Sequence, residues 1–346
     1  MSEQPLRYDS QLRCLPVATL YLTERCNSRC VTCDHWRHGR ADMNLESVVR
    51  LLPSLARLQT QLVLLSGGEP LLNAEWRDIA LLLRESGLRL WLLTSGLSLA
   101  KHVQPASELF DAITVSLDGT DRATYAAIRG LDAFEKVSAG IRAAANTGVP
   151  VSVRVTIQRA NYRQIPAFVD LARDMGVQQV SFLAVDVANP HAFGRLGDFG
   201  EGLALGRADL PELERILCRL ECDYAADFES GFIAESPRRM RRIHQYFAAI
   251  CGIGAYPPVR CNAPEFSAVI TATGQVNPCF FIAGPPQAIL VDGDLGAALN
   301  GDAVSRLRES IRAGGRSECA TCVCSLWRDA AHRTDSDFLL SRETNA

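Results

Sequence analysis

Twelve cysteines stand in this sequence of 346 residues, and eight of them fall into three groups whose spacing suits metal binding. The first group occupies eight residues with the pattern Cys-x3-Cys-x2-Cys, and the other two groups lie near the C-terminus. Thiolates at such spacings are the usual protein ligands of zinc and of iron-sulfur clusters. The groups are Cys26, Cys30 and Cys33, then Cys261 and Cys279, then Cys319, Cys322 and Cys324.

Charge and hydropathy exclude several classes of protein. The formal net charge of −3 provides no basic field for nucleic acid, and the arginines of residues 238–242 are interpreted as one solvated helix face. The N-terminus lacks the apolar core of a signal peptide, and no apolar run reaches the ~20 residues that cross a bilayer. We therefore expect a cytoplasmic protein that binds neither nucleic acid nor a membrane. Its clustered cysteines should hold metal, because disulfides are rare in a reducing compartment.

The elements that must position the first cysteines are repeated βα units. Short apolar runs alternate with longer segments of helical period, which is the pattern around a parallel sheet. Six units fall short of a closed eightfold barrel, so the predicted fold class is α/β, a partial (β/α)6 TIM-like barrel with a small C-terminal α+β β-hairpin domain. The predicted strands occupy residues 17–22, 62–65, 88–93, 112–116, 151–155 and 179–183.

Two amphipathic helices are especially clear between these strands. Apolar residues at helical spacing follow Asn44, a good N-cap, and Pro53 is expected to kink or end that helix. A second helical pattern, over residues 162–175, leads into the sixth strand.

From about residue 186 the βα alternation stops. Loop residues and then helical stretches at residues 210–220 and 235–249 replace it, and residues 267–276 predict a β-hairpin in which Gly274 supplies the turn. The loop residues are Asn189, Pro190, Gly194, Gly197 and Gly200. The expected domains are an N-terminal extension (1–16), a barrel core (17–185), a helical linker region (186–250), an auxiliary domain (251–328) and a polar C-terminal tail (329–346).

Loops able to do chemistry follow the first four predicted strands. In a parallel βα barrel the active site is built from the loops after the C-terminal ends of the strands. We therefore expect these four loops to converge on one rim. They carry the first cysteine group, then Ser66-Gly67-Gly68-Glu69-Pro70, then Thr94-Ser95-Gly96, then Ser116-Leu117-Asp118-Gly119.

The Cys-x3-Cys-x2-Cys pattern after the first strand resembles the signature of the radical S-adenosylmethionine (SAM) superfamily, and the resemblance covers roughly residues 17–184. Three cysteines leave the fourth iron of a 4Fe-4S cubane open to a ligand that is not protein. In that family the open iron binds the methionine amino and carboxylate groups of SAM. An electron from the cluster then cleaves SAM to methionine and a 5'-deoxyadenosyl radical, which abstracts a hydrogen atom from the substrate.

The same resemblance implies contacts with SAM. The Gly-Gly-Glu-Pro run is similar to the family motif that meets the methionine amino group, and the serine after strand four commonly faces the ribose. Thr32 departs from the pattern, since many members carry an aromatic residue there that packs near adenine. For Ser116, Asp118 and Arg154, a strand-end turn and a surface ion pair remain as alternatives. The implied contacts are Gly67, Gly68, Glu69, Pro70, Thr94, Ser95, Ser116, Asp118 and Arg154.

The C-terminal cysteines resemble the auxiliary-cluster extension called SPASM, or its shorter form Twitch, which wraps a 4Fe-4S cluster around a β-hairpin. A full SPASM domain binds a second auxiliary cluster through a longer run of cysteines, which is missing after Cys324. The resemblance therefore implies one auxiliary cluster. Its expected ligands are Cys261, Cys279, Cys319 and Cys322, with Cys324 as a replacement for Cys322 or an unligated neighbour.

Zinc binding remains open for both sites. Cys-x2-Cys is also a zinc spacing, and His35 or His38 could complete a site in the first group. The C-terminal spacing also fits a zinc ribbon. The chain would then be a zinc-stabilised binding protein that does not cleave SAM.

Three further cysteines have less defined roles. Cys218 and Cys222 are interpreted as small, buried apolar residues. Cys251, ten residues before Cys261, has the same interpretation, with one functional alternative. It could return a hydrogen atom to the substrate radical, as in radical SAM epimerases.

The resemblance also guides expectations about substrate and partners. Twitch enzymes act on small molecules, whereas many peptide-maturing relatives carry an added N-terminal domain, and only 25 residues precede Cys26 here. We therefore expect an oxidoreductase acting on a small, carbohydrate-like or other specialised metabolite, with a peptide-modifying maturase or epimerase as the alternative. A flavodoxin or ferredoxin is the expected reductant.

Overall fold

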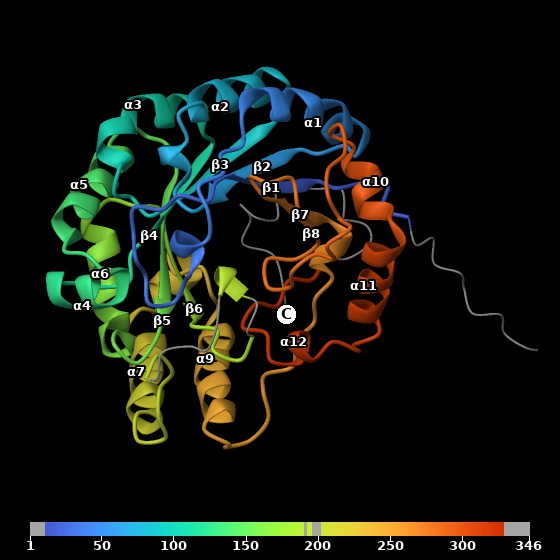
Figure 1. Ribbon diagram of the computed structural model, residues 1–346. Helices are drawn as coiled ribbons and strands as arrows, with labels where there is room; N and C mark the ends of the chain where they lie inside the picture. The colour runs from blue at the N-terminus through green and yellow to red at the C-terminus, as the bar shows by residue number, and fades with distance from the viewer. Residues whose placement is uncertain (1–10, 190–191, 196–201, 329–346) are drawn as a thin grey trace, which may run out of the picture.

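A single curved sheet runs through the computed structural model, which describes residues 11–189, 192–195 and 202–328 (Figure 1). Its strand order is β6-β5-β4-β3-β2-β1-β7-β8, and every neighbouring pair is parallel except the antiparallel β7 and β8. The strands are β1 (Val17–Thr23), β2 (Leu62–Gly67), β3 (Arg89–Thr94), β4 (Ala112–Ser116), β5 (Val151–Ile157), β6 (Gln179–Ala184), β7 (Ser267–Ile270) and β8 (Val276–Asn277). The six strands predicted for the barrel all form, and the open sheet has the partial-barrel fold expected.

Helices pack along the outer side of the curved sheet (Figure 1). The main buried core contains apolar residues of both the strands and these helices. The described helices are α1 (Leu45–Arg57), α2 (Trp76–Glu85), α3 (Leu99–Leu109), α4 (Arg122–Arg129), α5 (Phe134–Ala145), α6 (Ile165–Asp174), α7 (Leu210–Asp223), α8 (Ala225–Ser230), α9 (Pro237–Ile250), α10 (Leu295–Asn300), α11 (Asp302–Arg312) and α12 (Ser317–Ala320). Short 3-10 turns are η1 (His35–Arg37), η2 (Pro70–Leu72), η3 (Tyr162–Gln164), η4 (Ala192–Gly194) and η5 (Ala263–Glu265).

Residue alternation sets which side chains face the inside of the sheet. On β5 the valines at 151, 153 and 155 are buried, whereas Arg154 between them is exposed. Because successive side chains of a strand point to opposite faces, the valines pack under the helices and Arg154 faces the inner side of the curve. On β5, the side chains that could meet a ligand are therefore those that alternate with the valines.

Helix α1 begins as predicted but does not end at the predicted proline. The Asn44 side chain caps it by accepting a hydrogen bond from the Ser47 amide at 2.9 Å. The helix continues for four residues past Pro53. Proline removes the hydrogen bond to the carbonyl of Val49, and Val49 lies on the exposed side of the helix, where water can satisfy that carbonyl.

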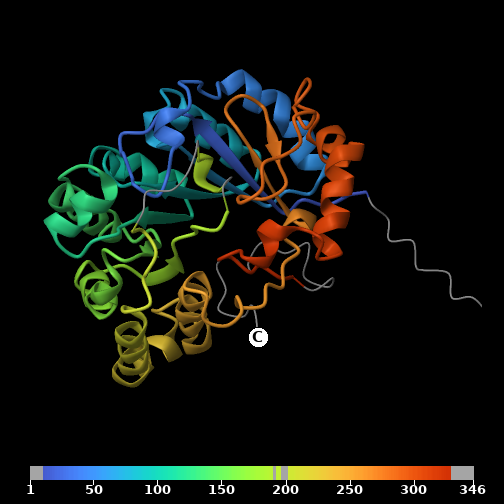
Figure 2. The ribbon, with the colours of Figure 1, turned by 60° about the horizontal axis from the view of Figure 1, so that its bottom comes forward.

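The C-terminal hairpin joins the barrel sheet. Strand β7 pairs in parallel with β1, from Val17 opposite Ser267 to Leu20 opposite Ile270, and the hairpin lies next to β1 in both ribbon views (Figure 1, Figure 2). Gly274 occupies the turn with a φ of +81°, a conformation that glycine adopts without strain. The sequence predicted the hairpin but not its pairing with β1, which brings the two cysteine-rich regions onto one sheet.

The region after β6 is mainly helical, as predicted. Helices α7 and α9 pack against each other, and Ile233 forms an isolated parallel bridge with Val180. The predicted loop residues Pro190, Gly197 and Gly200, and the predicted N-terminal and C-terminal segments at residues 1–10 and 329–346, lie outside the described residues. Among the residues that the structure covers, no helix combines the length and apolarity needed to span a bilayer.

Candidate active site

The first cysteine group lies on the loop that leaves β1, and the neighbouring loop after β2 holds it in place. Cys26, Cys30 and Cys33 are all half-buried. The Gly68 amide donates to the Thr23 carbonyl at 2.8 Å, and the Glu69 amide donates to the Arg25 carbonyl at 2.8 Å. These backbone bonds fix the start of the cysteine loop to the end of the adjacent strand.

The close contact between these loops explains the two glycines of the predicted motif. A Cβ on Gly68 would lie 2.1 Å from the Arg25 carbonyl oxygen, and Gly67 has a φ of +120°. Any side chain at Gly68 would push the cysteine loop away from β2. Gly67 and Gly68 are therefore required by the protein's own packing, whether or not SAM is present.

Glu69 links the second and third strand ends. Its buried carboxylate accepts hydrogen bonds from the Thr94 hydroxyl (2.7 Å), the Ser95 hydroxyl (2.6 Å) and the Ser95 amide (2.7 Å), and a longer one from the Leu71 amide (3.3 Å). Burial raises the pKa of Glu69, and these hydrogen bonds act in the opposite direction. Four donors occupy the carboxylate, so a methionine ammonium would have to share an oxygen with them.

Asp118 is held by an arginine that sequence reasoning missed. Its carboxylate accepts from the Thr156 amide at 2.7 Å and forms a buried ion pair with Arg129, with 2.8 Å between Nε and Oδ2. The same guanidinium donates through Nη1 to the Cys30 sulfur at 3.6 Å. Arg129 thus connects the loop after β4 to a predicted metal ligand.

Two observations show that the end of α4 is built against the cysteine loop. The carbonyl of Arg129 accepts from the Arg29 amide at 3.1 Å, and a Cβ on Gly130, whose φ is +75°, would lie 2.4 Å from the Arg29 carbonyl oxygen. A signal for Arg129 was present in the sequence. It follows Tyr125 by four residues and Ile128 by one, so it stands on the buried face of an amphipathic helix, where a charged residue needs a partner.

Ser116 and Arg154 face the inner side of the sheet as direct neighbours on β4 and β5. Ser116 is half-buried and Arg154 is exposed. The positive charge of Arg154 lowers the pKa of the half-buried Glu235 and of Cys324, in each case against the larger effect of burial, which raises it. Arg154 therefore lies near the C-terminal cysteines. It also occupies the position on β5 at which the sequence resemblance predicts a contact with SAM.

The second and third cysteine groups come together in one small cavity. Cys261, Cys279, Cys319, Cys322 and Cys324 all line it. Backbone amides already point at two of the sulfurs, since the Phe281 amide donates to Cys279 at 3.4 Å and the Cys324 amide donates to Cys322 at 3.3 Å. The structure thus brings together all five candidates for the four ligands of an auxiliary cluster, including both Cys322 and Cys324.

Thiols in both regions are in environments that favour their neutral form. Burial raises the pKa of Cys26 to about 11 and those of Cys33 and Cys279 to about 12. A bound metal ion would deprotonate such thiols directly. All-cysteine donor sets suit iron-sulfur clusters, and the residues fit that group. Within the described ranges, no three Cys, His, Asp or Glu side chains are arranged around a single metal-ion position.

Tyr21 lies between the two cysteine regions. Burial, and then the charges that Cys33 and Cys279 would carry as thiolates, raise the pKa of its phenol. Its ring makes an edge contact with the His35 ring, with 5.5 Å between centroids. Strand β1 therefore carries a residue that lies close to a cysteine of each group.

The remaining predicted residues are less closely connected to these sites. Pro70 is buried at the start of η2. Cys251 caps the C-terminal end of α9, is half-buried, and points its thiol at the Leu205 carbonyl at 3.4 Å. Cys218 and Cys222 are exposed on α7, so the expectation that they are buried apolar residues is wrong.

Comparisons with known proteins identify the barrel. The family model described as the Radical SAM superfamily matches residues 20–172. The Fe-coproporphyrin III synthase of Methanosarcina barkeri (strain Fusaro / DSM 804) is 30% identical over 179 residues, which is 48% of this chain and 43% of that protein. A probable GTP 3',8-cyclase of Saccharolobus islandicus (strain L.S.2.15 / Lassen #1) is 29% identical over 181 residues, which is 51% of this chain and 58% of that protein. The chain thus spans about half the length of these curated relatives.

Structural likeness extends beyond the barrel. SuiB from Streptococcus suis, in a crystal structure with bound SAM, superposes on 91% of this chain and 74% of its own, with a TM-score of 0.64 and 14% sequence identity. At that identity the match concerns the fold alone. It nevertheless includes most of the C-terminal region, which the family model leaves out.

Proposed function

Since residues 20–172 of this chain form a radical SAM domain, which in its family binds SAM and a 4Fe-4S cluster, we propose that the chain is a radical SAM oxidoreductase. It reductively cleaves SAM to a 5'-deoxyadenosyl radical and abstracts a hydrogen atom from a small specialised metabolite. An auxiliary 4Fe-4S cluster on the C-terminal cysteines assists a net oxidation or rearrangement. The observation that carries the proposal is the contact of the cysteine loop with the loop after β2 and with Arg129 at one edge of the sheet.

In this proposal the chain's own residues position the reactants. Cys26, Cys30 and Cys33 hold the SAM-binding cluster, and Arg129 donates to one of those sulfurs. The loops that Glu69 and Asp118 fix form the wall against which SAM binds. The bound cofactors supply the electron and the radical chemistry, while the protein supplies orientation and excludes water.

The names of the sequence relatives support a small-molecule substrate. One is named for a coproporphyrin product and another for a GTP cyclisation, and both resemble this chain over about half its length. The two named molecules differ chemically from each other, and what they share is that both are small molecules. A metabolite is therefore the leading substrate class for this chain.

Peptide modification is a second candidate, because one observation favours it. SuiB has also been crystallised with its precursor peptide SuiA, and that structure likewise covers 91% of this chain with a TM-score of 0.64. A chain with this fold can therefore accommodate a peptide. A substrate peptide would direct the radical to one of its own side chains, giving a crosslink or an epimer.

The proposal includes an external electron donor and a cytoplasmic setting. The chain needs a flavodoxin or ferredoxin to reduce the first cluster. The electron donor follows from the sequence resemblance, and a reducing setting suits thiols that are to hold iron-sulfur clusters.

The proposal is tested by counting cofactors and assaying SAM cleavage. The chain is purified without oxygen and reconstituted, and iron and sulfide are measured in the wild type and in a Cys26→Ala, Cys30→Ala, Cys33→Ala variant. 5'-Deoxyadenosine is assayed with dithionite and SAM. We expect about eight irons in the wild type, about four in the variant, and cleavage only in the wild type, since each cubane holds four irons.

Other results would separate the alternatives. About twelve irons would indicate a third cluster, as in a full SPASM domain. Zinc in place of iron, with no 5'-deoxyadenosine, would support the zinc-stabilised binding protein and reject the proposal.

A further inference from the structure

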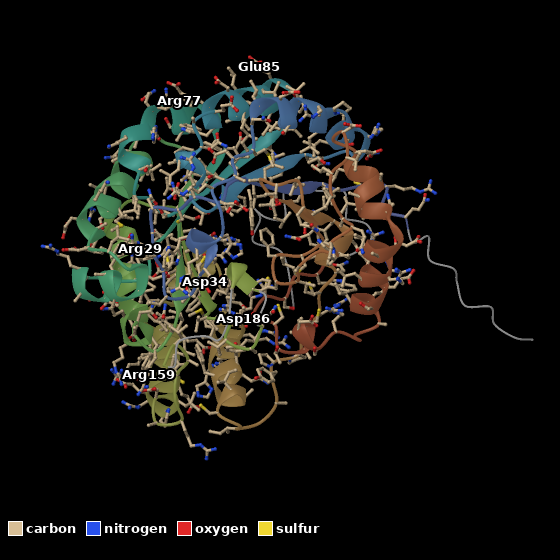
Figure 3. The ribbon with its side chains drawn as sticks, viewed as in Figure 1. Arg29, Asp34, Arg77, Glu85, Arg159 and Asp186 are labelled. Carbon is tan, nitrogen blue, oxygen red and sulfur yellow. The ribbon has the colours of Figure 1, made fainter. Side chains whose placement is uncertain are left out.

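The segment after β6 connects the two cysteine regions. The Asp34 amide, next to Cys33, donates to the Phe193 carbonyl at 3.2 Å. The Asn189 side chain donates to the carbonyl of Phe281, two residues after Cys279. In Figure 3, Asp34 and Asp186 lie near the middle of the molecule, whereas Arg77 and Glu85 lie at its outer edge. This segment therefore contacts both cysteine regions.

Asp186, at the start of this segment, has one carboxylate oxygen without a partner. Its side chain is fully buried, and Oδ1 accepts hydrogen bonds from the Ala188 and Asn189 amides at 3.0 Å each. Oδ2 is buried and accepts none. A buried charged oxygen without a donor is costly, so such an atom calls for a functional explanation.

Charged and polar groups from distant parts of the chain lie near this carboxylate. Burial raises the pKa of Asp186, and the nearby Arg195 guanidinium acts in the opposite direction. Burial is the main cause of the raised pKa values of Tyr246 on α9, of Tyr256 and of Cys322, and the charge of Asp186 raises each of them further. Asp186 thus lies where the C-terminal end of β6, the end of α9 and the auxiliary cysteines meet, which is the ligand-binding end of a βα barrel.

The position of Arg195 indicates what Oδ2 should bind. The guanidinium donates to the backbone carbonyls of Asn189, at 2.8 Å, and of Asp186. The positive charge of the Arg195 guanidinium therefore offsets the negative charge of the Asp186 carboxylate, although the guanidinium donates no hydrogen bond to Oδ2. The free oxygen therefore needs a hydrogen-bond donor more than it needs a second positive charge, and a neutral hydroxyl meets that requirement.

We propose that Asp186 Oδ2 accepts a hydrogen bond from a hydroxyl group of the substrate and holds a polyhydroxylated metabolite between the two cysteine regions. This inference rests on the proposed function and specifies its substrate class. Asp186 is then a substrate-binding residue that no sequence motif marks. A matched residue at the opposite end of the sheet is Asp111, whose Oδ2 accepts from the Leu90 amide at 2.8 Å before β4 begins.

The test measures ligand binding to the reconstituted full chain with SAM present. The probes are a panel of pyranoses, cyclitols and nucleosides, each with its deoxy and amino-deoxy analogues, detected by saturation-transfer NMR. Asp186→Asn is compared with the wild type and with Asp111→Asn. We expect at least one hydroxylated probe to bind about tenfold to a hundredfold more weakly to Asp186→Asn, the usual cost of losing a hydrogen bond to a charged group. Binding to Asp111→Asn should not change.

Two further measurements make the result specific. The deoxy analogue that lacks the recognised hydroxyl should bind the wild type and Asp186→Asn equally. Asp186→Asn should stay folded, because asparagine still accepts from both amides, and thermal unfolding measures the stability lost by leaving the buried Arg195 guanidinium without the opposing charge. Equal binding by both proteins, or binding of amino-deoxy probes alone, would overturn the proposal, as would a panel in which no hydroxylated probe binds the wild type.

Substrate-free cleavage of SAM separates this inference from the proposed function. If the wild type forms no 5'-deoxyadenosine with dithionite, the proposed function fails. If the wild type and Asp186→Asn both form it at the same rate and bind every probe alike, only the role of Asp186 fails.

Discussion

The two cysteine regions of this molecule are built in opposite ways. The first lies within eight residues on one loop, and strand ends and the end of α4 hold that loop by backbone hydrogen bonds. The second collects residues from positions 261 to 324, and its cysteines are themselves part of two small apolar clusters. Cys261 packs with Ala263 and Phe266, while Cys279 and Cys319 pack with Ile282, Leu307 and Ile311.

This difference has a consequence for the role of metal in folding. The barrel fixes the first loop whether or not its thiols are ligated. The apolar clusters around the second group of cysteines are small, so a metal cluster there would act as a cross-link between distant segments. We therefore expect the first cysteine loop to keep its conformation without metal. The C-terminal region, in contrast, should need its bound cluster in order to stay folded.

Removing iron from the whole protein should affect the two regions most unequally. Without metal, the amides of α11 and α12 should exchange with solvent about a hundredfold faster, since closing a long loop contributes a few kcal/mol. Amides of β1 to β6 should be nearly unchanged. Hydrogen exchange of the anaerobic protein with and without clusters measures this. The triple alanine variant of the first group serves as control, and an equal loss of protection in the barrel strands would contradict the comparison.

Arg129→Met tests how strongly the barrel holds the first region. It leaves Asp118 buried without its ion-pair partner, which typically costs about 3–5 kcal/mol, and it removes the donor to Cys30. Urea unfolding should show the loss of stability, and SAM cleavage should slow.

A double variant separates the two effects of this change. Asp118→Asn with Arg129→Met should regain much of the stability but not the rate, because Cys30 still lacks its donor. Arg122→Met, at the exposed start of the same helix, should resemble the wild type. Full recovery of the rate in the double variant would reject a role for the contact between Arg129 and the Cys30 sulfur.

Glu69→Gln should have a smaller effect on the same region. An amide NH2 would face the donors on Thr94 and Ser95 that now bind the carboxylate, and losing a hydrogen bond to a charged group costs about 1.5–3 kcal/mol. Urea unfolding measures the change. Glu85→Gln at the outer edge (Figure 3) is the control. If both variants were equally stable, Glu69 would not link the strand ends.

The smallest effect is expected at Cys324. Cys324→Ser should keep about four irons in the auxiliary site, whereas Cys322→Ser should lose them, because we predict Cys322 as the fourth ligand. Iron analysis in the background of the first-group triple variant isolates that cluster. Retention of iron by Cys322→Ser and its loss from Cys324→Ser would reverse the assignment.

Patterns of neighbouring residues in the sequence were sufficient to predict most of the strands and the hairpin turn. Short apolar runs predicted the six barrel strands, and Gly274 predicted the turn of the hairpin that forms. These features depend on neighbours in the chain, so the sequence displays them directly. Pro53 was a partial exception, because the surrounding helical turns continue past it.

The sequence by itself determined the cysteine spacing, the barrel strands and the order of the loops on one rim. Only the tertiary structure decided that β7 pairs with β1, that Arg129 reaches Cys30, and that Asp186 keeps a buried oxygen without a partner. The first two features join residues more than 90 positions apart. The third depends on which groups surround a single buried oxygen atom. Spacing and periodicity describe neighbours along the chain, whereas burial and pairing across the sheet arise only when the packed core brings distant segments together.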